Sequence, residues 1–410
     1  MAIANPALAG TGRRWPMLAL ISVSAFLPMT TWFSATAITP QLTRLWGLSP
    51  AQGAWITGAV QIGFAIGALA SSIAGLLDLV SLRRVMGVSA LMAAAANFCL
   101  LFVPCIPLLL IARLATGIAL AGVYPPAIKL VSTWFNQGRG TALGALLAAL
   151  TLGSAFPHLL SAQATELAWQ DVILATSLAA TLGAVLILWF GAEGPHSFAR
   201  STFDPRQIKT ILRNQALALA NIGYLGHMWE LYAMWGWILA YIHAGAPGLG
   251  VSSPGILSLL AFFVVASGGI GSILGGVAAD RIGRTATTAA MMAVSGFCTL
   301  LIGLVFDGPL WLFVAVAIVW GMTVIGDSAQ FSAMATELSD PRYVGTALSL
   351  QLSAGIALTF VSIHLTSFVA ESIGWRWSFL VLTPGPLLGV AAMLLLRRMP
   401  TARQIANGLR

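Results

Sequence analysis

The sequence alternates long apolar runs with short polar connections. About 20 consecutive apolar residues cross a bilayer as an α-helix, and twelve runs reach roughly that length. They cover residues 16–38, 51–77, 85–104, 106–131, 141–163, 171–191, 215–242, 254–279, 285–306, 309–337, 344–370 and 375–396. This pattern predicts an all-α membrane protein with twelve transmembrane helices.

The basic residues divide unevenly between the two sides of the predicted membrane. With both termini inside, sixteen of the 20 Lys and Arg residues fall on the inner side, and only Arg44 and Arg376 fall outside. This bias is the positive-inside pattern. It predicts a multi-pass protein of the cell (inner) membrane, surrounded by the lipid bilayer, with cytoplasmic termini.

The chain also repeats itself. The longest polar connection, residues 192–214, separates six spans in 1–191 from six in 215–410. Gly140–Leu143 in the fifth span recurs as Gly345–Leu348 in the eleventh, at the equivalent place in the second half. Two parallel, pseudo-symmetric six-helix halves with a site between them are a transporter architecture. We therefore expect two six-helix halves joined by a cytoplasmic loop.

Composition excludes other classes of protein. The chain is 58% hydrophobic and 8% charged, whereas soluble domains carry roughly 25% charged residues. The net charge of +8 is spread over the ends of spans and forms no patch for nucleic acid. The three cysteines lie in or beside apolar runs, so no disulfide framework is expected. No nucleotide loop or nucleophile–base pattern occurs, so we expect neither an enzyme nor a cofactor.

The loop after the eighth span carries a known motif. Gly276–Arg284 reads GVAADRIGR and resembles the GxxxDRxGR loop of the major facilitator superfamily at every defined position. The counterpart after the second span keeps Asp78 but is otherwise degenerate, and Arg113–Gly117 resembles the RxxxG pattern of the fourth helix. The resemblance covers essentially the whole chain and implies the major facilitator fold.

The same resemblance implies a gate on the inner side. It places Asp78 beside the eleventh helix and Asp280 beside the fifth, where an aspartate can face the positive N-terminus of a helix. Ladders of small residues, such as Gly63, Gly67 and Ser71, let helix backbones approach closely, and the family pairs helices two with eleven and five with eight. The gating residues that we expect are Asp78, Arg83, Gly276, Asp280, Arg281, Gly283 and Arg284.

Polar side chains within the spans suggest the substrate site. A charged side chain at mid-bilayer costs about 2.5–3.5 kcal/mol on insertion scales, so it usually faces a cavity or a partner. The family lines its cavity with helices one, four, seven and ten. On these helices the candidate substrate-binding residues are Trp32, Arg113, Tyr124, His227, Glu230, Trp237, Asp327 and Gln330. Among them Glu230, Asp327 and His227 are candidates for proton coupling.

Several of these residues have alternative interpretations. Glu230 can instead pair with another helix and only stabilise the bundle. Tyr124 precedes two prolines, which predicts a kink in helix four. His158 and His364 occupy equivalent places in the two halves, either as packing residues or in a proton relay with His227. Lys129 can simply extend its charge toward the inner surface.

These observations predict a secondary active transporter that moves a small polar solute, most simply a small organic anion, by proton-coupled alternating access. Small-molecule substrate and protons would be its partners, and a monomer is expected. The helix around Glu230 is similar to bacterial members near the cyanate and nitrate permeases, although the arginines of nitrate permeases in helices two and eight are absent. Three alternatives remain: a proton-driven exporter of organic cations, a divalent-metal transporter with ligands such as His227, and a transporter-like sensor.

Overall fold

The computed structural model describes residues 13–135, 139–163, 168–196, 207–340 and 344–410, and these residues contain helices and connections but no strand. The helices are α2 (Arg14–Met29), α3 (Ser34–Ala37), α4 (Thr39–Trp46), α5 (Pro50–Ile73), α6 (Leu76–Leu79), α7 (Leu82–Phe98), η1 (Cys99–Phe102), α8 (Ile106–Leu120), α9 (Tyr124–Trp134), α10 (Arg139–Ala162), α11 (Trp169–Phe190), α12 (Ile208–Arg213), α13 (Gln215–Leu249), α14 (Pro254–Ile282), α15 (Arg284–Leu304), α16 (Leu310–Gly326), α17 (Ser328–Leu338), α18 (Val344–Ile373), η3 (Trp375–Leu382), α19 (Pro384–Arg398) and η4 (Pro400–Gly408).

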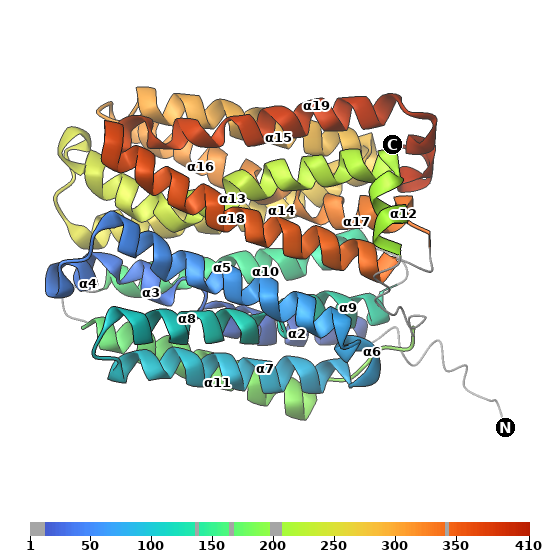
Figure 1. Ribbon diagram of the computed structural model, residues 1–410, viewed down its shortest axis with the longest axis horizontal. Helices are drawn as coiled ribbons and strands as arrows, with labels where there is room; N and C mark the ends of the chain where they lie inside the picture. Colours follow the sequence, from blue (N-terminus) through green and yellow to red (C-terminus); the bar gives the residue numbers. More distant parts are fainter. Residues whose placement is uncertain (1–12, 136–138, 164–167, 197–206, 341–343) are drawn as a thin grey trace.

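The long helices form two layers that run side by side. Helices α2 to α11 make one half, coloured blue to green, and α13 to α19 make the other, coloured yellow to red (Figure 1). The C-terminus and α12, in the connection between the halves, lie at the same end of the bundle, as six crossings in the second half require. The all-α, two-half fold is therefore confirmed, whereas the loop boundaries 192–214 stay a prediction because residues 197–206 lie outside the described residues.

Most of the predicted spans are single helices or pairs in line. Ten helical segments of the described residues are long and apolar enough to cross a membrane. Of the other two predicted spans, the first is the shorter apolar helix α2, which α3 follows after a break. The seventh is α13, whose 35 residues extend about 52 Å at 1.5 Å per residue.

Three helices are interrupted near the middle of the bundle. α2 ends at Met29 before α3 begins at Ser34, and α16 gives way to α17 at Asp327. α8 ends at Leu120 and α9 begins at Tyr124, which confirms the predicted bend in helix four. Backbone that leaves helical geometry at membrane depth must be buried in protein or line a cavity, so these breaks mark the centre of the molecule.

The halves meet as the family resemblance implies, because α5 packs on α18 and α10 on α14. The small-residue ladders only partly serve this contact. A Cβ on Gly63 would lie 2.1 Å from the carbonyl oxygen of Leu114, and one on Gly271 would lie 1.8 Å from that of Met322. Leu114 lies in the same half as Gly63, and Met322 lies in the same half as Gly271. These glycines therefore permit close packing within each half and do not form the contact between the halves.

Candidate functional site

A cavity of about 40 Å³ lies between the two halves, beside the breaks in the helices. Its walls come from six of the predicted spans, on α2, α9, α10, α13, α16–α17 and α18. All its lining side chains are neutral. The polar and aromatic ones are Tyr124, Thr151, Ser154, Tyr224, Tyr232, Trp235 and Ser328.

Aromatic side chains join the two halves beside this cavity, which Tyr232 and Trp235 line and Trp32 and Phe33 do not. Trp32 of the first half stacks on Tyr232 of the second, with ring centroids 5.4 Å apart, and Phe33 contacts Trp235 edge-on at 6.1 Å. The indole nitrogens of Trp32 and Trp235 are buried without a hydrogen-bond partner among the described residues. A buried unpartnered donor costs about 1–3 kcal/mol, so these N–H groups are suited to bind a ligand or water.

Sequence reasoning missed several of the residues around the cavity. Tyr224, Tyr232 and Trp235 line it, yet they were outside the predicted site. Gln61 on α5 is fully buried, and neither its amide nitrogen nor its oxygen has a partner among the described residues. The sequence signal for Gln61 was its place among the small residues of the second span, where packing alone would favour another small or apolar residue.

Arg113 is fully buried but does not line the cavity. Its guanidinium donates hydrogen bonds to the carbonyl oxygens of Thr31 (2.9 Å) and Trp32 and to the Ser34 hydroxyl (3.3 Å). These groups belong to the break between α2 and α3, where the helix leaves backbone carbonyls unpaired. The geometry explains Arg113 as a clamp on this break, and its predicted contact with substrate stays a prediction.

Glu230 likewise points into its own half. Its carboxylate accepts a hydrogen bond from the Trp320 indole N–H at 2.6 Å and another from the Ser295 hydroxyl. Both donors are buried, and Glu230 does not line the cavity. The arrangement therefore matches the alternative in which this acid pairs with neighbouring helices and stabilises the bundle.

His227 and Asp327 form a second buried polar pair. The Nδ1 atom of His227 lies 2.8 Å from Oδ1 of Asp327, at the junction of α16 and α17. The next residue after each of them, Met228 and Ser328, lines the cavity. Oδ1 of Asp327 makes no hydrogen bond with the described residues, so this is an ion-pair contact by distance alone, and it lies directly behind the cavity wall.

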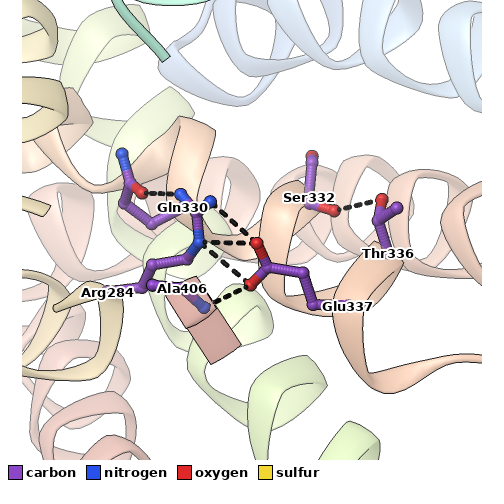
Figure 2. Close-up of polar contacts among 6 residues, drawn as sticks. All are labelled: Arg284, Gln330, Ser332, Thr336, Glu337 and Ala406. Carbon is purple, nitrogen blue, oxygen red and sulfur yellow. Dashed lines mark hydrogen bonds and ion pairs between the residues drawn. The ribbon is translucent and has the colours of Figure 1, made fainter. Parts of the chain in front are cut away.

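Gln330 belongs to a polar network at the end of the second half where the C-terminal segment lies, rather than to the cavity. Arg284 donates to the Gln330 side-chain oxygen at 2.8 Å and holds both carboxylate oxygens of Glu337 (Figure 2). The backbone N–H of Ala406 donates to the same carboxylate at 3.1 Å. The C-terminal segment is thereby tied to the loop motif.

The other predicted gating residues lie at the same end of the bundle. The Asp280 carboxylate is about 3.4 Å from where a Cβ on Gly140 would sit, in the first turn of α10, so it faces the fifth helix as predicted. A Cβ on Gly276 would meet nothing closer than the Gly140 carbonyl oxygen, at 3.8 Å. Of the other predicted gating residues, Arg83 donates a hydrogen bond to the Gly191 carbonyl oxygen, and Arg281 is exposed. Gly283 has a φ of +91°. The Asp78 side chain lies outside the described residues.

The remaining candidates lie apart from the cavity. Trp237 donates its indole N–H to the Ile363 carbonyl oxygen at 2.9 Å. His364 packs on Phe360 and Trp55, and His158 is buried in α10. Lys129 donates to the Leu77 carbonyl oxygen. No group of three or more His, Cys, Asp or Glu side chains that could hold a metal ion occurs in the part of the chain that the structure describes.

The contacts of Glu230 generate a test of its role. Glu230→Ala removes the acceptor of two buried donors, at about 1–3 kcal/mol for each, so we expect a lower unfolding temperature of the purified protein in detergent. Glu371→Ala removes an exposed carboxylate of the same half and should leave that temperature unchanged. If Glu230→Ala has the unfolding temperature of the wild type yet loses transport, Glu230 acts on substrate or protons instead.

Comparison with known proteins agrees with this geometry. A model of the Major Facilitator Superfamily matches residues 20–268 and 248–409. Solved structures with the same fold include the nucleoside transporter NupG, with a TM-score of 0.70, 14% identity, and 93% of this chain and 99% of that chain covered. A bacterial homologue of the human lysosomal transporter Spinster has a TM-score of 0.68, 14% identity, and coverage of 94% and 97%. At this identity the likeness shows the fold alone.

Two characterised relatives match shorter stretches. The niacin transporter NiaP of Acinetobacter baylyi is 33% identical over 127 residues, which are 28% of each chain. The 3-(3-hydroxy-phenyl)propionate transporter of Escherichia coli is 29% identical over 160 residues, 38% of this chain and 36% of its own. The matched stretches thus span about a third of these relatives. The family match and both names point to a transporter and not to an enzyme, and the chain belongs to the major facilitator superfamily.

Proposed function

We propose that the protein carries a small aromatic carboxylate across the membrane by alternating access, coupled to protons. The observation that carries this proposal is the neutral, aromatic and hydroxyl-lined cavity between the halves. Rings of Tyr232 and Trp235 offer faces and edges for an aromatic solute. The niacin and hydroxyphenylpropionate of the two relatives both combine an aromatic ring with a carboxyl group.

A carboxylate can be held here without a cation in the wall. α9 begins at Tyr124, which lines the cavity, and no acidic residue lies in its first turn. Pro125 and Pro126 in this turn lack a backbone N–H, so the helix end contributes its dipole but few donors, and the hydrogen bonds to a carboxylate must come mainly from side chains. The unpartnered indole N–H of Trp235 and the Tyr124 hydroxyl add neutral donors.

The structure represents a closed state in this scheme. A cavity of about 40 Å³ has room for a few water molecules, since each needs about 10–15 Å³ on this measure. An aromatic acid therefore requires the halves to part around the cavity. The stacked rings of Trp32 and Tyr232 would separate in that motion. The organic-cation alternative has less support, because both Glu230 and Asp327 bind partners behind the wall.

Counterflow in proteoliposomes tests the proposed substrate class. Vesicles loaded with niacin or 3-(3-hydroxyphenyl)propionate should take up the same labelled compound, whereas succinate and tetraphenylphosphonium should give no uptake. Tyr124→Phe removes one hydrogen bond of about 0.5–1.5 kcal/mol, so KM should rise about 2- to 10-fold. Tyr241→Phe removes a hydroxyl that bonds Arg376 outside the cavity and should leave KM unchanged. Uptake of the cation alone would contradict the proposal.

Proton coupling is proposed to run through His227 and Asp327. Asp327→Asn removes the group that exchanges a proton with the imidazole, so accumulation driven by a pH gradient should be lost while counterflow persists. Asp307→Asn changes an exposed acid that pairs with Arg376 and should retain accumulation. Undiminished uphill transport by Asp327→Asn would remove this pair from the coupling mechanism.

A further inference from the structure

A second and larger pocket opens between the halves at the end of the bundle opposite α12 and the C-terminus. Its volume is about 480 Å³. One wall is made by α3, α4 and the start of α5 in the first half, and the other by the last turns of α13 and by Trp375. In Figure 1 this is the left end of the molecule, where α4 is labelled. The positive-inside pattern predicts that this end faces outward.

The charged and titratable side chains of this pocket are basic. Arg44 on α4 and His243 on α13 both line it, and no Asp or Glu does among the described residues. Burial, and then the nearby charge of Arg44, lower the pKa of His243, so His243 offers a neutral imidazole and Arg44 carries the positive charge. Neither makes a hydrogen bond or an ion pair with another described residue, and Arg44 is exposed. Arg44 thus offers a full set of guanidinium donors to an anion.

Among the described residues, the acidic groups at this end of the bundle either have partners elsewhere or do not line the pocket. Asp307 pairs with Arg376 at 3.0 Å, and Asp171 accepts from the backbone N–H of Ala168. Glu371 is exposed on α18 and does not line the pocket. The start of α5, at Ser49 and Pro50, adds the positive end of a 24-residue helix to the wall.

Aromatic rings complete the pocket. Trp237 and Trp375 line it with their ring centroids 5.4 Å apart. Indole faces bind planar rings, and a guanidinium can bind a carboxylate with two parallel hydrogen bonds. Thr43 adds a hydroxyl at the rim beside Arg44. A planar ring with one carboxylate fits this combination better than a cation or a purely aliphatic solute does.

The pocket and the central cavity lie in series along α13. Trp235 lines the cavity, whereas the next two residues, Gly236 and Trp237, line the pocket. Between them the Phe33 and Trp235 rings pack edge-on, and a Cβ on Gly236 would lie 3.2 Å from the Thr57 side chain. The two spaces are therefore separated by a thin aromatic layer.

We propose that this outer pocket is an anion-binding antechamber, in which Arg44 and His243 capture an aromatic carboxylate before the aromatic layer opens to the central cavity. The substrate class rests on the function proposed above, whereas the attraction of anions rests on the pocket alone. A cleft lined by one sign of charge raises the local concentration of opposite charges and can speed their arrival by a factor of 10 or more.

Cysteine accessibility measures this attraction without requiring transport. In full-length protein with its three cysteines replaced, Thr43→Cys places a thiol at the rim of the pocket. At each thiol the rate of an anionic sulfonatoethyl methanethiosulfonate is divided by the rate of its cationic trimethylammonium analogue. We expect this ratio to be about 10-fold higher at Thr43→Cys than at native Cys105 retained alone. Cys105 is exposed and does not line the pocket. Arg44→Gln and added salt should abolish the bias, and Arg44→Lys should retain it.

The anion site is then located by testing whether a ligand protects the thiol from modification. Nicotinate should slow modification of Thr43→Cys, and its uncharged counterpart nicotinamide should not. Arg44→Gln should abolish protection, whereas Tyr124→Phe in the central cavity should keep it. A reagent bias that survives Arg44→Gln, equal protection by nicotinamide, or no protection by nicotinate would overturn the antechamber. Protection without counterflow would instead contradict the proposed transport function and leave the antechamber supported.

Discussion

An ionisable group inside a bilayer must find its partner within the protein, and here Arg113 and Glu230 each find theirs within their own half. Arg113 binds the carbonyl oxygens released where α2 ends, and Glu230 accepts from Trp320 and Ser295. The wall between the halves is consequently free of charge and lined by rings and hydroxyls. The break of helix one, the rigidity of each half and the chemistry of the cavity all follow from this arrangement.

Contacts between the halves are of a kind that can separate at low cost. They include stacked rings such as Trp32 on Tyr232, packing of α5 on α18, and a hydroxyl pair between Ser72 and Ser349 at 2.6 Å. None of these contacts leaves a buried charge behind when the halves part. The ionic contacts of Arg284 with Glu337 lie within the second half and can persist through such a motion.

Much of the fold was predictable from the sequence, because lipid imposes span length and the loop motif fixes the family. The bend before Tyr124 followed from two prolines, which lack a backbone N–H. The direction of Glu230 could not be predicted. α13 is buried on nearly all sides, so its polar pattern does not show which face meets the cavity. Pro28 in the last turn of α2 is a sequence signal for the break after Met29, but nothing in residues 30–33 shows that their carbonyl oxygens bind Arg113.

The central claim is that a neutral cavity recognises an aromatic carboxylate while the buried side chains of Arg113 and Glu230 hold the structure. A thermal-shift screen of the purified protein tests it most directly, with aromatic and aliphatic carboxylates, organic cations and divalent metals compared at equal concentration. A ligand at 100 times its Kd stabilises the folded state by about 2.7 kcal/mol. The account predicts that aromatic carboxylates alone raise the unfolding temperature. Stabilisation by organic cations or metals, without any by aromatic carboxylates, would contradict it.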